Sequence, residues 1–119
     1  MDIELYRNYC LEKPGVTEEF PFDNRTLVFK VCGKMFSLLD IESFDSVNLK
    51  CDPEKAIQLR EHYSGVIPGY HMNKKHWNTV TCDGSIPDKL ILEWTNDSYN
   101  LVLNSLPLKV RKEITQTND

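Results

Sequence analysis

Apolar and polar residues alternate along the chain in patterns that predict helices near both ends and strands between them. Residues 3–11 space Ile3, Tyr6 and Cys10 three and four positions apart, which places them on one face of an amphipathic helix. Pro14 follows, and because proline cannot continue the helical hydrogen-bond ladder, the helix must end before it. The chain is therefore expected to begin with one short helix that buries a single face.

Six later segments are rich in strand-forming residues or alternate apolar and polar positions with a period of two, as half-buried strands do. These predicted strands span residues 16–22, 27–31, 34–39, 46–51, 66–69 and 77–82. Only Cys32 and Gly33 separate the second segment from the third, and a short connection that contains glycine is typical of a β-hairpin. The second and third strands are therefore predicted to pair, with Lys34 at the exposed end of the hairpin.

Two further helices are predicted, one in the middle of the chain and one toward its end. Asp52 is a good N-cap and Pro53 suits a first helical turn, so a helix begins there and ends at Gly65. Residues 87–106 also follow a helical pattern. The polar run 95–98 suits caps better than a helix interior, so we expect a break in the helix at that point.

The predicted order α-β-β-β-β-α-β-β-α implies an α+β two-layer sandwich, in which helices pack on a mostly antiparallel sheet of about five to six strands. The 119 residues fit one compact domain. We assign this domain to residues 1–114, including one added helical turn at 109–114, and expect a frayed tail over 115–119.

The composition is that of an ordinary globular protein, with 40% hydrophobic residues. No apolar run approaches the roughly 20 residues of a membrane helix. The chain starts with Met1, Asp2, Ile3 and Glu4, which is acidic where an export signal is basic, so we expect a cytoplasmic protein that does not enter a membrane. The cysteines are far apart and include no CxxC pair: Cys10, Cys32, Cys51 and Cys82. This spacing favours reduced thiols over disulfides or a zinc site, and no cofactor is expected.

The net charge of −4 is an average over very different segments. Acidic residues are concentrated near the N-terminus, whereas residues 24–39, 62–82 and 98–112 contain no Asp or Glu. Overall acidity weakens nonspecific attraction to nucleic acid, but the acid-free segments can still form a local basic surface if the fold brings them together.

The segment from Pro68 to Thr79 has the most unusual composition, with two His, two Lys, two Asn, a Tyr and a Trp but no acid. Flat rings beside cations suit phosphates and unstacked bases. Lys34 on the preceding hairpin, with Lys30 beside it, offers a second basic position. The candidate nucleic-acid contacts are Lys30, Lys34, Tyr70, His71, Asn73, Lys74, Lys75, His76 and Trp77.

Three other interpretations of this segment stay open. It can be a polar hairpin with its rings in the core and its lysines in water. A metal site is disfavoured because His71 and His76 are five residues apart and no nearby carboxylate completes a ligand set. Nucleophilic catalysis by Cys82 or Ser85 beside a histidine lacks a GxSxG elbow or a glycine-rich phosphate loop, so we predict a protein without enzymatic activity.

Several motifs along nearly the whole chain resemble the MmcQ/YjbR-like family. They are Pro14-Gly15, Glu19-Phe20-Pro21-Phe22, Phe29-Lys30-Val31, Gly33-Lys34-Met35-Phe36, Leu49-Lys50-Cys51-Asp52-Pro53, Leu59-Arg60, the stretch PGYHMNKKHW over 68–77, Ser98-Tyr99 and Leu106-Pro107. The resemblance implies a small bacterial cytoplasmic protein with a CyaY-like α+β fold. Family members are often described as DNA-binding proteins that grip a duplex with two hairpin wings, which correspond here to Gly33-Lys34 and to residues 70–77.

The leading hypothesis is a non-enzymatic, monomeric module that contacts double-stranded DNA through these two wings, with lysines on phosphates and Asn73 on a base edge or a phosphate. The alternative is a protein- or small-ligand-binding domain in which His71, His76 and Trp77 line a pocket and no nucleic acid is bound. Rings exposed beside lysines favour the first hypothesis, and rings that converge on a cavity favour the second.

Overall fold

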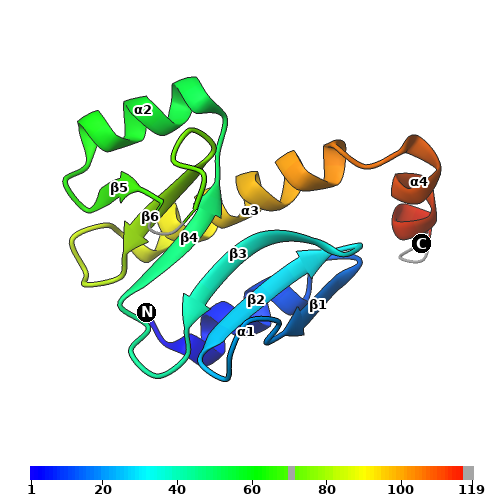
Figure 1. The fold of residues 1–119 in the computed structure, drawn as a ribbon, viewed down its shortest axis with the longest axis horizontal. Coiled ribbons are helices and arrows are strands. Elements are labelled where there is room, and N and C mark those ends of the chain that lie inside the picture. The colour runs from blue at the N-terminus through cyan, green and yellow to red at the C-terminus, as the bar shows by residue number, and fades with distance from the viewer. Residues whose placement is uncertain (70–71, 117–119) are drawn as a thin grey trace.

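The computed structural model describes residues 1–69 and 72–116, which form six strands and four helices (Figure 1). In chain order the elements are α1 (Ile3–Leu11), β1 (Val16–Glu19), β2 (Thr26–Val31), β3 (Lys34–Asp40), β4 (Ser46–Lys50), α2 (Pro53–His62), β5 (Val66–Pro68), β6 (Trp77–Thr81), α3 (Asp88–Asn104) and α4 (Leu108–Gln116). No helix in the described ranges is long and apolar enough to cross a membrane.

The strands form one sheet in the order β1-β2-β3-β4-β6-β5, and every neighbouring pair is antiparallel. Helices α1 and α3 pack on one face of this sheet; α3 passes behind β4 in Figure 1 and contacts both β3 and β4. The predicted α+β class with an antiparallel sheet is therefore confirmed. The opposite face, which we call the open face, carries no helix in the part of the chain that the structure describes.

The main core lies between the sheet and the helices because alternate strand residues point to that side. On β4, Val47 and Leu49 are buried against the helices, while Asn48 between them faces the open side. Tyr6 of α1 is fully buried in the same core, and its hydroxyl hydrogen-bonds to Ser37 Oγ at 2.7 Å and to Thr95 Oγ1 at 3.0 Å. This shared polar contact ties α1 and α3 to the sheet.

The hairpin between β2 and β3 turns through Cys32 and Gly33, as the sequence predicts. Both residues have positive φ angles, 48° and 83°, which is the backbone form of the tight turn that matches the right-handed twist of paired strands. Lys34 is exposed at the start of β3, directly after the turn. The hairpin therefore presents this lysine at the end of the sheet.

The predicted break at residues 95–98 is wrong, because α3 runs without interruption from Asp88 to Asn104. The polar side chains are satisfied inside the helix and across to the sheet. Thr95 Oγ1 donates to the carbonyl of Ile91 at 2.7 Å, and Ser98 Oγ donates to the carbonyl of Phe36 at 2.6 Å. A buried partner for each hydroxyl removes the reason for the helix to break.

Several element boundaries also differ from the prediction, among them the end of α2, which is His62 and not Gly65, the end of β1 and the extent of α4. β1 ends at Glu19, and the apolar residues that follow lie in an exposed loop, where Phe20 is 46% and Phe22 is 64% exposed. The predicted extra turn at 109–114 is part of the longer helix α4, whose Ile114 packs against Gly15. Of the predicted tail, residues 117–119 lie outside the described residues.

Candidate functional site

The sheet separates between β3 and β4, and this separation forms the candidate site. The two strands pair from Ser37–Leu49 to Leu39–Val47, and β3 bulges next to Phe36, where its register against β2 shifts. Beyond the last pair, Ser98 of α3 bridges the strands. Its Oγ donates to the Phe36 carbonyl and accepts the backbone N–H of Lys50 at 2.9 Å. A helix side chain therefore replaces the missing strand-to-strand hydrogen bond.

An open hollow of about 450 Å³ lies over this separation. Its lining includes Val102 of α3, so the hollow reaches between the strands toward the helix layer. The other lining residues come from the open face and from the β1–β2 loop: Pro21, Phe22, Lys30, Gly33, Lys34, Met35, Lys50 and Trp77. Three lysines thus surround one partly apolar depression, which we call the lysine hollow.

The three lysines differ in their electrostatic surroundings. Lys30 forms an ion pair with Glu19 on the neighbouring strand, so its charge is largely balanced. Lys34 is exposed and Lys50 is half-buried, and neither forms an ion pair with a carboxylate of the described residues. Lys34 and Lys50 are therefore the two cations of the hollow that can contact an anion without first losing an ion-pair partner among the described residues.

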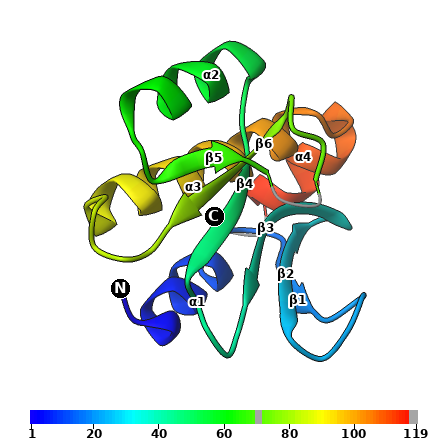
Figure 2. The same cartoon turned by 60° about the vertical axis from the view of Figure 1, so that its left-hand side comes forward.

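The loop between β5 and β6 approaches the hollow from the other side. Because Lys50 pairs with Trp77 at the end of β4, this loop and the β2–β3 hairpin leave the sheet at the same end (Figure 2). Lys74 and Lys75 are exposed in the loop. The fold therefore brings two of the acid-free segments to one end of the sheet.

Asn73 and Arg60 hold this loop in shape. Asn73 Oδ1 accepts the backbone N–H of Lys75 at 3.0 Å, and its carbonyl accepts the N–H of Trp77 at 3.0 Å, so Asn73 organises the turn. The Arg60 guanidinium of α2 donates to the Lys74 carbonyl and, at 2.6 Å, to Asn78 Oδ1. Both side chains support the position of the lysines.

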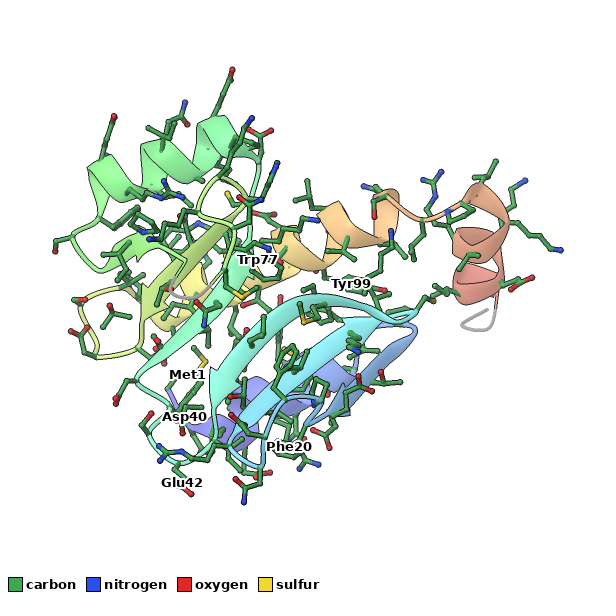
Figure 3. All side chains as sticks on the ribbon, in the orientation of Figure 1. Met1, Phe20, Asp40, Glu42, Trp77 and Tyr99 are labelled. Carbon is green, nitrogen blue, oxygen red and sulfur yellow. The ribbon has the colours of Figure 1, made fainter. Side chains whose placement is uncertain are left out.

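The Trp77 side chain forms part of the wall of the hollow, and its ring is buried. It is 7% exposed and packs with Val28 and Leu38 on the open face, a small cluster separate from the main core (Figure 3). Gly69 makes this packing possible, because a Cβ at that position would lie 2.7 Å from the Trp77 Cβ. Among the described residues that line the hollow, the aromatic ring that solvent reaches is Phe22.

The two histidines that the structure describes, His62 and His76, do not line the hollow. His76 is half-buried, and its carbonyl accepts the backbone N–H of Cys51 at 2.7 Å. No histidine is among the described residues that line the hollow. Tyr70 and His71, both predicted as contacts, lie outside the described residues. Within the described ranges, no three His, Cys, Asp or Glu side chains are placed to hold a metal ion.

No Asp or Glu is among the described residues that line the hollow. Asp40 and Glu42 pair with Arg25 where β3 ends, at the opposite end of the sheet from Trp77 (Figure 3). The backbone N–H groups of Ser43 and Glu42, with the Arg25 guanidinium, hold the pKa of Asp40 below its usual value. Glu19, through its pair with Lys30, is the acid that reduces the charge of the hollow itself.

The fold brings three further residues to this site that are not among the contacts predicted from the sequence. Lys50 alternates with the buried Leu49, and that alternation already indicates that Lys50 faces the open side. Phe22 was expected in a strand, and only the early end of β1 leaves it exposed. Arg60 lies within the middle helix that the sequence predicts, and its contact with the β5–β6 loop depends on tertiary packing that no local pattern reports.

Together these features define a small α+β protein with an open sheet face and a lysine-lined hollow at one end. The chain belongs to the YjbR family, because the family model for YjbR matches residues 11–101. It is 38% identical over 117 residues to YjbR of Escherichia coli K12, covering 98% of this chain and 99% of that relative. YbdF of Escherichia coli O157:H7 is 38% identical over 112 residues, with coverage of 93% and 92%.

Two solved structures have the same fold. The crystal structure of Deinococcus radiodurans protein DR2400, family-model domain DUF419, is 42% identical, with a TM-score of 0.87 over 95% of this chain and 87% of that chain. A Pseudomonas syringae protein is 28% identical, with a TM-score of 0.73 over 86% of this chain and 99% of that chain. The resemblance that the motifs carry is thereby confirmed at the level of the family and the fold.

Proposed function

We propose that this protein is a non-enzymatic module that binds double-stranded DNA on the open face of its sheet, at the end that carries the lysine hollow. The observation that carries the proposal is the lysine hollow, flanked by the β2–β3 hairpin and the β5–β6 loop. Lys34, Lys50, Lys74 and Lys75 would contact phosphates along the backbone of the duplex. Phe22 would contact a sugar or a base edge beside them.

The charge distribution predicts how such binding behaves. Phosphate contacts release counterions, so the observed binding constant falls steeply as salt rises. The overall charge of −4 opposes approach at long range, whereas the few local lysines act at short range. We therefore expect weak affinity with a clear salt dependence and little sequence preference.

The test is a salt titration of duplex DNA binding, followed by fluorescence anisotropy of a labelled duplex. Lys34→Ala, Lys74→Ala and Lys75→Ala should each reduce the slope of log affinity against log salt by about 0.9. Lys89→Ala is the matched control, because Lys89 is an exposed lysine of α3 in the helix layer and should leave the slope unchanged. A wild-type protein that binds no duplex at low salt contradicts the proposal.

The alternative, a small-ligand-binding domain, is favoured by one observation. Trp77 is buried in the wall of the hollow and does not offer its ring to a nucleic acid. In that case Lys34 and Lys50 would hold a small anion in the hollow. Inorganic phosphate or a mononucleotide that binds as tightly as a duplex, with a loss of affinity in Lys50→Ala, would support this alternative over DNA.

A further inference from the structure

A second cavity lies on the helix-covered face of the sheet and shares only Lys50 with the lining of the lysine hollow. It has a volume of about 160 Å³ and lies between α2 and α3, above β4 and β6. Its apolar walls are Leu49, Leu59, Val80, Trp94 and Leu101. An apolar cavity of about 150 Å³ is large enough to hold benzene, so this one has room for a single six-membered ring.

The cavity exists because α2 is held apart from α3. The buried residue of α2 is Ala56, which is too small to fill the space beneath the helix. Arg60 bonds α2 to Asn78 on β6, and the Tyr63 ring after α2 contacts the Trp94 ring at a centroid distance of 5.2 Å. These contacts fix the spacing of the helices, so the cavity does not close by simple collapse of α2 onto the sheet.

The mouth of the cavity is polar and balanced in charge. Lys55 Nζ of α2 and Asp97 Oδ2 of α3 form an ion pair across it at 3.0 Å, with both side chains about half exposed. Lys50 and Asp52 also line the cavity, which gives two cations and two anions. A balanced mouth favours a neutral ligand, and an exposed ion pair of this kind is weak enough to accept a ligand group in its place.

We propose that this cavity binds a small neutral aromatic molecule of the phenol class. The ring would occupy the apolar space beside Trp94, where it replaces an unfilled volume with dispersion contacts. The hydroxyl would lie at the mouth, where it can accept a hydrogen bond from Lys55 and donate one to Asp97. A carboxylate or an ammonium group on the ring would lose its hydration without net attraction to the balanced charges at the mouth, so a neutral hydroxyl is preferred.

Phenol itself is the probe, and the two tryptophans of the chain give the readout and its internal control. Trp94 lines the cavity, whereas Trp77 lies on the opposite face of the sheet. In ¹H–¹⁵N spectra of the full chain, phenol should shift the Trp94 indole signal in a saturable way and leave the Trp77 signal in place. Benzoate should bind more weakly than phenol.

A substitution that fills the cavity distinguishes phenol binding there from binding elsewhere on the surface. Leu101 is 38% exposed at the cavity wall, so Leu101→Trp should fold and should weaken phenol binding on the order of tenfold by occupying the space. Leu108→Trp, at a 57% exposed position of α4, should leave the affinity unchanged. A Trp94 signal that phenol does not shift, two indole signals that move together, or benzoate binding tighter than phenol would each overturn the proposal.

Discussion

Ser98→Ala should destabilise the protein far more than the removal of a single oxygen atom suggests. The Ser98 hydroxyl is fully buried and serves two backbone groups on different strands, the Phe36 carbonyl at 2.6 Å and the Lys50 N–H at 2.9 Å. Alanine leaves both groups without this partner at the point where β3 and β4 no longer pair. We therefore expect a large loss from the removal of one oxygen atom.

The magnitude follows from the burial of the two groups. Leaving a buried backbone group unsatisfied costs about 1–3 kcal/mol, and the Phe36 carbonyl is such a group. The Lys50 N–H is on a half-buried residue, so water compensates part of its loss. Alanine has the better helix propensity, which returns up to about 0.5 kcal/mol. The net expectation is a loss of about 2–3 kcal/mol in the free energy of unfolding.

Urea denaturation followed by circular dichroism measures this loss. The matched control is Ser105→Ala, because Ser105 is an exposed serine at the end of the same helix. Its hydroxyl donates to the Val102 carbonyl, within its own helix, at 2.6 Å. This control should change the free energy of unfolding by about 0.5 kcal/mol or less. Equal effects of the two substitutions would refute the bridging role of Ser98.

Three further predictions follow from buried and charged groups. Tyr6→Phe should cost about 1–2 kcal/mol in urea denaturation, because two buried hydroxyls lose a shared partner. Hydrogen bonding to Arg7 lowers the pKa of Glu18, so the ionised carboxylate stabilises the fold at pH values above its unfolded pKa. This stabilisation is lost as the carboxylate is protonated. The Tm of the wild type should therefore fall more than the Tm of Glu18→Gln when the pH is lowered below about 5. Burial raises the pKa of the Cys10 thiol to about 12, whereas Cys32 is exposed. Iodoacetamide at pH 8 should therefore alkylate Cys32 before Cys10, as measured by peptide mass mapping. Modification of Cys10 first would contradict this prediction.

Local patterns in the sequence predicted the elements whose cause is local. The hairpin at Cys32 and Gly33 depends on a short glycine-containing turn, and α2 begins at Pro53 behind its N-cap Asp52, whose side chain accepts the backbone N–H of Glu54. Both features follow from the chemistry of a few adjacent residues. The sequence was therefore a sufficient guide to the order of the elements and to the fold class.

The same local reasoning failed where distant contacts decide the outcome. The run 95–98 lies inside a helix because Thr95 and Ser98 find buried partners, one of them on β3. Only the separation of β3 from β4 places Lys50 beside Lys34 around one hollow. The basic residues were visible in the sequence, whereas the depression that gathers them is a property of the folded sheet.

Chemical-shift mapping of the ¹⁵N-labelled protein with a short DNA duplex shows whether DNA binds at the lysine hollow. We expect shifts at Lys34, Lys50 and residues 72–77, at one end of the open face, and unchanged signals for α1 on the helix-covered face. These shifts should disappear as salt rises, because counterion release drives the contacts. Absence of shifts at low salt, or shifts concentrated on the helices, would contradict the account.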